Sequence, residues 1–588
     1  MKKIIDVLQE VMEGGFEQAG YDKKFGFVTV SNRPDLCQYQ CNGAMAAAKQ
    51  YKMAPFQIAE KVVEAVKEND IFEKIEMVKP GFINITVSGK LLVDFGKAMM
   101  TEEKFGIPAP EKERTVVIDY GGANVAKPLH VGHLRPAIIG ESVKRICRFM
   151  GDKVIGDVHL GDWGLQIGLI INEVRHRQPE LPYFDADFTG EYPKEAPFTI
   201  SDLEQIYPHA SGYAKEHEDY MQEAQQITAQ LQEGHPGYIA LWQHILSVSI
   251  EDLKKNYDKL DVHFDLWKKE SDAQPYIPDM VEKMKADGLA YMSEGALVVD
   301  VTEEGDKKEL PPCLIVKSNG ASLYATTDLA TIVERRKLFD PKKIIYVVDK
   351  RQGLYFEQVF RCARKTKIIG DDVDLIFVGF GTMNGKDGKP FKTRDGGVLR
   401  LETLLSDVEK QVEDKMADRD MEEDVRHAAA QKIGLAAIKY GDLSNQASKD
   451  YVFDVDRFTS FEGNTGPYIL YTIVRIKSLM NKVKAQGIEV KGEEAILPSQ
   501  SKSQTDVMLA VSKWAETIEA AFNEQAPHKI CQFIYELSDA FNKFYHENKI
   551  VTNEDEKVRA SYIALSRFVG NVLEQGINLL GLEAPDKM

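Results

Sequence analysis

Several features that mark particular protein classes are missing from this 588-residue chain. No apolar run approaches the roughly 18 residues that a membrane-spanning helix needs, so we expect no membrane partner. The six cysteines are scattered and include no CxxC pair, which indicates reduced, mostly buried thiols in a cytoplasmic protein. No histidine or cysteine group has the spacing of a zinc site, and no Walker loop, Ser-His-Asp arrangement or solenoid-type repeat is visible.

The chain also lacks an excess of positive charge. The chain has 74 Lys and Arg residues against 92 Asp and Glu residues, which leaves a formal net charge of −18. That balance argues against a general nucleic-acid coat protein, but an enzyme that acts on nucleic acid needs only local basic surface. Clusters such as Arg361, Arg364 and Lys365 are either such a surface or ordinary solvated helix faces. Charge alone does not decide the function.

The composition is that of an ordinary globular protein, with 43% hydrophobic and 28% charged residues. Length alone suggests about four domains. Residues 1–108 begin with an amphipathic helix pattern instead of a signal peptide, and then mix short strand and helix patterns. They predict a compact α+β module, which a Pro-containing linker at 106–115 joins to the rest of the chain.

The stretch 116–164 carries the clearest chemical signal. A β-branched run at 116–118 ends in two glycines, apolar residues recur at helical spacing from 134 to 150, and a second β-branched run follows at 153–160. Strand, turn, helix and strand predict one βαβ unit of a parallel sheet. His130 and His133 lie at its strand-to-helix turn, where such sheets bind phosphates.

The sheet is predicted to have two halves with a large insertion between them. Further β-branched runs at 343–349 and 373–379 flank a helical pattern around 356–365, and nucleotide chemistry is expected where the halves meet. We predict a catalytic domain at 109–400 with an insertion at roughly 175–340, a helical connecting region at 401–455 and a helical bundle at 456–588. The expected helices are 209–233, 238–258, 401–415, 421–440, 466–486, 502–523, 526–547 and 556–580, with strand-like material at 289–301 and 313–323.

Taken together, these motifs resemble the class I aminoacyl-tRNA synthetases. His-x-Gly-His at 130–133, a split sheet, a lysine-bearing loop and a helical C-terminal domain occur in one chain. The segments NVAKP at 124–128, GDWG at 161–164 and GPY at 466–468 are similar to the arginyl-tRNA synthetase family. The resemblance covers essentially the whole chain. It implies an α/β fold with a Rossmann catalytic domain and insertion, an N-terminal α+β module and a C-terminal all-α helical bundle.

The same resemblance implies a ligase that works in two steps. Arginine and ATP would give arginyl-adenylate and pyrophosphate, and the arginyl group would then pass to the terminal adenosine of the tRNA for arginine. In this family activation usually requires bound tRNA. A cytoplasmic monomer is implied, with Mg²⁺ arriving on ATP and no metal bound by the protein. The alternatives are a class I synthetase of other amino-acid specificity and a non-catalytic tRNA-binding paralogue.

Attack on the α-phosphate of ATP requires that the protein position the reactants and stabilise the developing charge. His130, Gly132 and His133 would contact ATP from the helix start; the alternative is that the histidines only cap the helix. The resemblance places a mobile cation in the loop after the second half-sheet, either Lys392 or Arg394. This loop departs from the Lys-Met-Ser-Lys-Ser pattern of class I enzymes.

A guanidinium substrate asks for carboxylates that match its planar fork. The resemblance assigns Glu270, Tyr324 and Asp328 to the arginine side chain, and the last two would share one helical face if a helix begins at Tyr324. Asn124 and Gln358 match the residues that hold the α-amino and carboxylate groups. Tyr355 stands where the resemblance leads us to expect histidine.

For tRNA, the implied surfaces are the N-terminal module and the C-terminal bundle. Asn32 and Gln38 lie in a turn that matches a segment contacting the tRNA elbow in relatives. Tyr468 and Tyr471 are candidates for stacking on unpaired anticodon bases, as are Phe541 and Tyr545. Aromatic residues at helical spacing are, however, more often part of a core.

Overall fold

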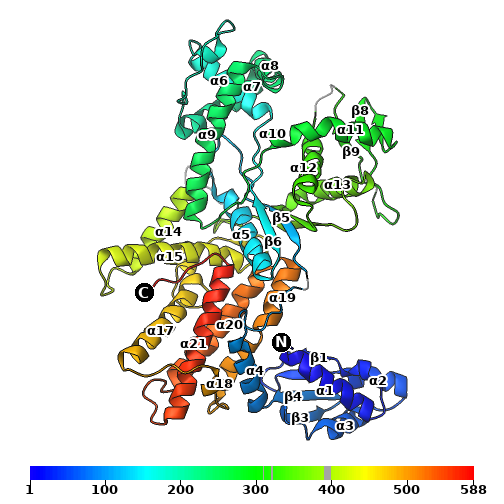
Figure 1. Ribbon diagram of the computed structural model, residues 1–588, viewed down its shortest axis with the longest axis vertical. Coiled ribbons are helices and arrows are strands. Elements are labelled where there is room, and N and C mark those ends of the chain that lie inside the picture. The colour runs from blue at the N-terminus through cyan, green and yellow to red at the C-terminus, as the bar shows by residue number, and fades with distance from the viewer. Residues whose placement is uncertain (111, 309, 319–321, 390–398) are drawn as a thin grey trace. The chain divides into compact units, whose positions relative to one another are not determined.

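The computed structural model describes the whole chain except residues 111, 309, 319–321 and 390–398. It consists of two compact units (Figure 1). The first contains residues 1–109, 461–578 and 583–588, and the second contains residues 110–460 and 579–582.

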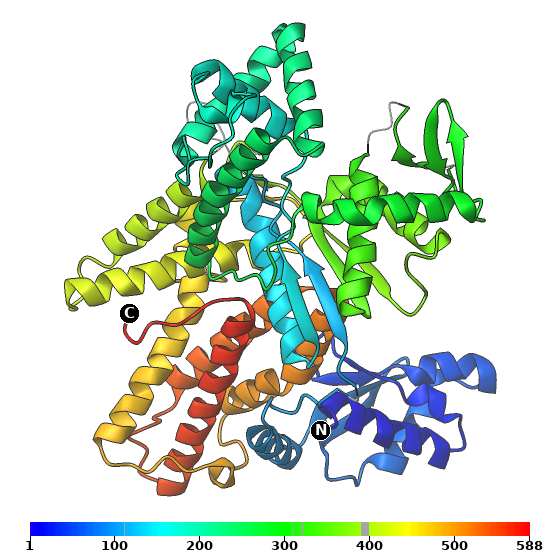
Figure 2. The same ribbon diagram turned by 45° about the horizontal axis from the view of Figure 1, so that its top comes forward.

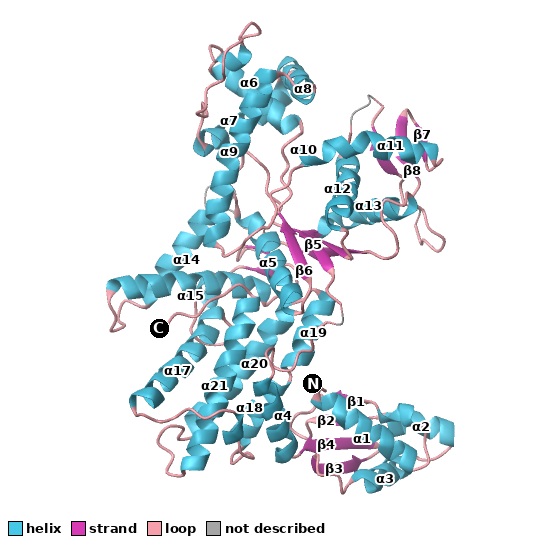
Figure 3. Ribbon diagram, in the orientation of Figure 1, coloured by secondary structure: helices cyan, strands magenta, loops and turns pink. Residues whose placement is uncertain are grey.

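A four-stranded parallel sheet organises the second unit (Figure 3). Its strand order is β11-β10-β5-β6, so strands from the two halves of the sequence pair directly, β10 against β5. Helix α5 connects β5 to β6 and α13 connects β10 to β11, as the period changes in the sequence predicted. The bounds are β5 Thr115–Asp119, α5 Leu134–Phe149, β6 Lys153–Asp157, β10 Lys343–Asp349, α13 Gly353–Lys365 and β11 Asp374–Phe380.

The insertion between β6 and β10 forms two bodies, one of helices and one of mixed structure (Figure 2). The helical body contains α6 Leu165–Arg177, α7 Ile200–Glu216, α8 Glu218–Gln232 and α9 Pro236–Lys259. The mixed body contains α10 Glu270–Ala273, α11 Ile277–Ala286, an antiparallel sheet of β7 Ala290–Ser293, β8 Ala296–Val299 and β9 Cys313–Val316, and α12 Tyr324–Phe339.

The predicted helix at 209–233 was wrong in both its start and its continuity. Helix α7 begins nine residues earlier, at Ile200, because Thr199 and Asp202 form a capping box: each side chain accepts a hydrogen bond from the backbone N–H of the other. The chain turns to an extended conformation at His217, where α7 ends and α8 begins with two acidic residues.

Buried polar contacts join one of the remaining helices of the second unit, α15, to α5. The Arg135 side chain on α5 bonds to the Asp442 carboxylate at 3.0 Å and to the Gly381 carbonyl at 2.7 Å, and both charged groups are buried. This pair therefore joins α5 to α15 below the histidine turn. The elements are β12 Met383–Asn384, α14 Leu401–Lys415, α15 Glu423–Leu443, β13 Tyr451–Val452 and α16 Val455–Phe458.

The first unit combines an antiparallel sheet module with a helical bundle. The sheet order is β1-β2-β4-β3. The module contains α1 Ile4–Gln18, β1 Val28–Val30, β2 Tyr39–Cys41, α2 Gly43–Tyr51, α3 Pro55–Val66, β3 Phe72–Val78, β4 Phe82–Val87 and α4 Gly89–Thr101. The bundle contains α17 Gly466–Ala485, α18 Lys502–Ser512, α19 Trp514–Glu524, α20 Pro527–Glu547 and α21 Glu556–Leu579. The single helix predicted at 502–523 is thus two, which meet at Lys513.

Two predictions from the sequence concern membrane-spanning helices and the cysteines. None of the helices among the described residues has the length and apolar character needed to cross a membrane. All six cysteines lie among the described residues, and all are buried.

Candidate active site

The histidine turn follows β5 at the carboxyl edge of the parallel sheet. Gly121 and Gly122 adopt φ values of +96° and +61°, a left-handed conformation that favours glycine and lets the chain leave the strand sharply. A short 3-10 turn at Val131–His133 leads into α5. The two imidazole rings lie 4.0 Å apart between centroids. The predicted strand, turn and helix are therefore confirmed.

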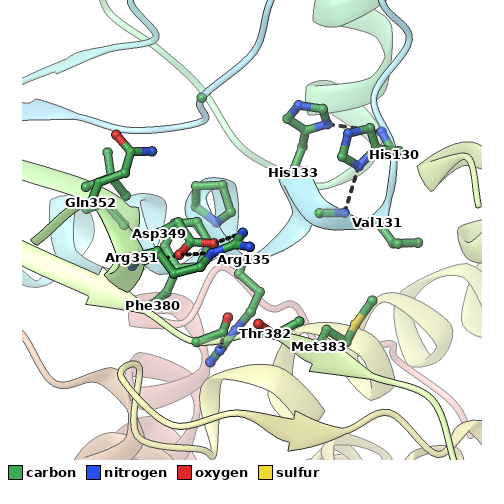
Figure 4. Close-up of a pocket in the computed structure, with 16 residues that line it drawn as sticks. His130, Val131, His133, Arg135, Asp349, Arg351, Gln352, Phe380, Thr382 and Met383 are labelled. Carbon is green, nitrogen blue, oxygen red and sulfur yellow. Dashed lines mark hydrogen bonds and ion pairs between the residues drawn. The ribbon is translucent and has the colours of Figure 1, made fainter. Parts of the chain in front are cut away.

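Both histidines use the same ring nitrogen for structure. The Gly132 N–H donates to His130 Nδ1 at 3.0 Å, and the His130 N–H donates to His133 Nδ1 at 3.1 Å (Figure 4). Burial lowers the pKa of His133 to about 3, and burial together with the Lys127 charge lowers that of His130. Neutral rings that accept at Nδ1 carry their proton at Nε2. Capping thus leaves two Nε2–H donors for a ligand.

A cavity of about 420 Å³ opens beside these histidines. It lies at the carboxyl ends of β5, β10 and β11, where the two half-sheets meet, which is where nucleotides bind in such sheets (Figure 4). Both histidines contribute to its wall. Its other lining residues include Gly122, Val348, Gln352, Phe380, Thr382 and Met383.

The segment that follows the predicted cationic loop is attached to the histidine turn. Lys392 and Arg394 lie outside the described residues, but Arg400 forms an antiparallel bridge with His130. The Val131 N–H donates to the Leu399 carbonyl at 3.0 Å, and the Leu401 N–H donates to the Leu129 carbonyl at 3.0 Å. Arg400 also forms an ion pair with Glu204 of α7, beside a second cavity of about 220 Å³ that His130 also lines.

Asn124 and Glu270 converge over Gly161. A Cβ atom on this glycine would lie 2.4 Å from Asn124 Oδ1 and 3.7 Å from Glu270 Oε1, so any larger residue would push the Asn124 side chain from its place. Burial raises the pKa of Glu270 to about 7, and the nearby Asp162 and Asp328 carboxylates add to the rise. Two of the residues assigned to arginine from the sequence are therefore brought together.

Tyr324 and Asp328 lie on α12, and both are near enough to Glu270 for their charges to interact; we call Asn124, Glu270, Tyr324 and Asp328 together the arginine pocket. The helix begins at Tyr324, so the two residues share one face as predicted, although the tyrosine is 74% exposed. Burial raises the pKa of Asp328 to about 6. Its carboxylate accepts a hydrogen bond from the Tyr355 hydroxyl. Gln358 instead donates to the Pro311 carbonyl at 2.7 Å.

Two further carboxylates beside the pocket are already neutralised. Arg335 bonds to Asp119 at 2.6 Å and to Asp157 at 2.8 Å. Ligand atoms of these two aspartates and His159 lie within 4.8 Å of one another, a spacing that could hold a metal ion. The Arg335 guanidinium, however, already bonds to both aspartates. Glu270 and Asp328, in contrast, form no ion pair with any described residue, so both remain available to a cationic ligand.

Sequence reasoning did not assign the contacts of several of these residues. Arg335 and Arg400 pair with residues far away in the chain, and no local pattern marks them. Tyr355 was singled out only as a departure from the family pattern, and its bond to Asp328 was not foreseen. The residues of β10 and β11 that line the cavity were not named from the sequence. They were indicated only indirectly, because the ligand was expected at the carboxyl ends of both predicted strands.

The candidate tRNA residues lie in the first unit. Asn32 is exposed, whereas Gln38 accepts a hydrogen bond from the Val87 N–H at 2.8 Å through its side chain. In the bundle, Tyr468 and Tyr471 are partly exposed, and the Arg475 guanidinium lies 4.7 Å from the Tyr471 ring. Phe541 is fully buried, so its placement favours the core alternative.

Known families match the chain from end to end. The family profile "Arginyl tRNA synthetase N terminal domain" matches residues 2–87, "tRNA synthetases class I (R), catalytic domain" matches residues 95–455, and "DALR anticodon binding domain" matches residues 469–588. The catalytic-domain match by itself covers more than half of the chain.

Individual relatives agree with these profiles. The chain is 58% identical to an arginine–tRNA ligase of Agathobacter rectalis and 56% identical to one of Alkaliphilus oremlandii, in each case over 100% of both chains. Its fold is similar to the arginyl-tRNA synthetase structures of Plasmodium falciparum (TM-score 0.81, 24% identity) and Thermus thermophilus (TM-score 0.76, 19% identity), again over 100% of both chains.

Proposed function

The chain belongs to the arginyl-tRNA synthetase family and is an arginine–tRNA ligase, and we propose that its active site joins the histidine cavity to the Glu270–Asp328 pocket. ATP would bind in the cavity and the arginine side chain in the pocket. The observation that carries this assignment is that Glu270 and Asp328, two carboxylates whose charges interact, meet Asn124 at Gly161, while the turn that follows Asn124 presents two neutral Nε2–H donors.

The chemistry needs little covalent help from the protein. The arginine carboxylate attacks the α-phosphorus of ATP, the bond to the bridging oxygen breaks, and pyrophosphate leaves. His130 and His133 would donate to the phosphate oxygens as charge builds up on them, and Gly132 would let the ligand approach the backbone. Mg²⁺ would arrive with ATP. A hydroxyl of the terminal adenosine of tRNA then attacks the adenylate carbonyl, and AMP leaves.

Charge and shape favour arginine in the pocket. A planar guanidinium can bond to two carboxylates at once, and each charge-assisted bond contributes about 1.5–3 kcal/mol. Tyr324 would cover the side chain, while Asn124 would hold the α-amino group. Gln358 would take the substrate carboxylate after its amide leaves Pro311. High identity to arginine–tRNA ligases over the whole chain argues against another specificity or a non-catalytic paralogue.

The outer parts of the chain would bind tRNA. We assign residues 1–108 to the tRNA elbow, with Asn32 and Gln38 as contacts, and residues 456–588 to the anticodon, with Tyr468 and Tyr471 as stacking partners. Residues 109–400 would be catalytic, and 401–455 would connect them to the bundle. The enzyme would work as a monomer in the cytoplasm.

Replacing the loop cations should slow activation more than it weakens ATP binding. At least one of Lys392→Ala and Arg394→Ala should lower kcat for adenylate formation about 100-fold, because the lost charge stabilises the leaving pyrophosphate in the transition state. Single-turnover rates measured over a range of ATP concentrations separate the two effects. Equal, modest losses of ATP binding in both variants would contradict the role.

Arginine affinity should fall in acid. The pocket carboxyls have pKa values raised to about 7 and about 6 when empty, and a guanidinium binds their ionised forms. Protonation therefore competes with the substrate as pH falls through this range, and KM for arginine should rise about tenfold or more between pH 8 and pH 5.5. Glu270→Gln is the matched control, because it removes the group that titrates at the higher pH. A KM that is flat across this range would argue against the pocket.

Direct charging tests the overall function. Purified protein, ATP and radiolabelled arginine should transfer label to tRNA for arginine in an acid-precipitable form, whereas labelled lysine should not be transferred. Transfer of lysine at a comparable rate, or no transfer from arginine to active tRNA, would refute the function.

A further inference from the structure

Tyr355 reaches the arginine pocket from the second half of the sheet. It lies on α13, and its ring packs edge-on against Phe356 with centroids 5.3 Å apart. The hydroxyl donates to Asp328 Oδ2 on the neighbouring helix α12. The residue is partly buried at the margin of the core cluster that includes Leu329 and Phe356. Its contact with a carboxylate assigned to the substrate has no role in the reaction described above.

Asp328 needs outside help to stay ionised. Burial disfavours its charged form, and so does the nearby Asp119 carboxylate. Among the influences that oppose them, the Tyr355 hydrogen bond is the largest, followed by the His159 and Arg335 charges. Arg335 makes its own hydrogen bonds to Asp119 and Asp157. The ionisable groups around Asp328 are Asp119 on β5, His159 after β6, Glu270 on α10, Cys313 on β9, Arg335 on α12, Tyr346 on β10 and Tyr355 on α13.

The same hydrogen bond also restricts how Asp328 can turn. Oδ2 accepts from the phenol and keeps one lone pair, and Oδ1 keeps both of its lone pairs for a new donor. Glu270 lies close enough to Asp328 for the Asp328 charge to raise the pKa of Glu270. A guanidinium presents its N–H groups in a rigid fork, so its binding depends on two acceptors held in fixed places.

We propose that Tyr355 is a positioning residue for arginine selection, whose hydroxyl holds the Asp328 carboxylate charged and oriented toward the substrate guanidinium. This inference rests on the proposed role of Asp328 in binding arginine. It assigns a specificity function to a residue that does not itself contact the ATP cavity.

Tyr355→Phe tests this directly, because it deletes the hydroxyl and keeps the ring. KM for arginine at pH 7.5 should rise about tenfold, while kcat at saturating arginine and KM for ATP stay within about twofold. The acid limb of log kcat/KM for arginine should move about one pH unit higher, since Asp328 loses the hydrogen bond that favours its ionised form. A purely structural role would not shift that limb.

Tyr276→Phe is the matched control. Tyr276 packs against the same core cluster, but its ring faces the Lys337 ammonium at 4.9 Å. This variant should keep the wild-type KM and pH limb. Tyr355→His should restore most of the arginine affinity, because an imidazole N–H can donate to Asp328, and it carries the test if the phenylalanine variant does not fold.

The proposal fails if Tyr355→Phe matches Tyr276→Phe in both KM for arginine and the pH limb, or if the arginine and ATP constants change equally. It also fails if Tyr355→His is no better than Tyr355→Phe. Wild-type enzyme assayed in parallel separates this failure from failure of the proposed function, since the latter would remove arginine-dependent activity from the wild type itself.

Discussion

Asp328→Ala should lower kcat/KM for arginine by about three orders of magnitude, the largest loss expected from any single change in the pocket. The variant removes charge-assisted hydrogen bonds to the guanidinium and leaves one edge of a buried cation unpaired. KM for ATP should stay within about threefold, because the ATP cavity is lined by other residues. The assay is tRNA-supported ATP–pyrophosphate exchange over a range of arginine concentrations.

Asp340→Asn provides the matched control for this change. Asp340 follows the last residue of the same helix α12, is exposed, and tolerates asparagine in its left-handed conformation at φ 41°. Normal kinetics in Asp340→Asn alongside unchanged arginine constants in Asp328→Ala would remove Asp328 from the substrate site.

His133→Ala should reduce kcat for adenylate formation about 100-fold to 1,000-fold, with little change in KM for arginine, because it removes a donor aimed at the reacting phosphate. His130→Ala should have a similar effect and should also cost about 1 kcal/mol of stability through loss of the Gly132 cap. Single-turnover kinetics with saturating arginine and tRNA measure the chemical step.

Another histidine of the chain provides a control for the alternative that His130 and His133 only cap a helix. His235 also accepts a backbone hydrogen bond at the start of a helix, from the Tyr238 N–H at 3.4 Å. His235→Ala should therefore lower thermal stability without slowing adenylate formation. If His133→Ala and His130→Ala also lose only stability, capping is their sole role.

A pH profile adds a second readout for the pair. Burial lowers the pKa of His133 to about 3, so kcat for activation should show no step near pH 6.5 from protonation of this residue. Such a step, if it disappeared in His133→Ala, would show that the ring titrates in the normal range and is not the neutral donor described here.

The sequence predicted those parts of the fold that depend on local pattern. Strands β5 and β10 were expected from β-branched runs, and the helix predicted at 401–415 has the bounds of α14. The start of α7 was missed even though Thr199 and Asp202 form a capping box, because the Pro-rich residues before them obscured it. Lys513 keeps a helical φ and ψ where α18 and α19 meet. Because no glycine or proline stands at this junction, the sequence did not mark the break.

The residues of the candidate site also fall into those that a local pattern or a resemblance predicted and those that only the tertiary fold brings together. The histidine turn is a local motif, and the arginine residues were assigned by resemblance. Arg335 and Asp119 are 216 positions apart in the chain, and Tyr355 meets Asp328 only because α13 packs beside α12. Contacts of this kind depend on the tertiary fold, and neither composition nor periodicity encodes them.

ATP–pyrophosphate exchange, run with each amino acid in the presence of tRNA for arginine, tests most directly whether the Glu270–Asp328 pocket selects arginine for activation at the histidine turn. We predict exchange with arginine alone in the wild type and its loss in Asp328→Ala. Exchange with a different amino acid, or none with arginine and active tRNA, would contradict the account.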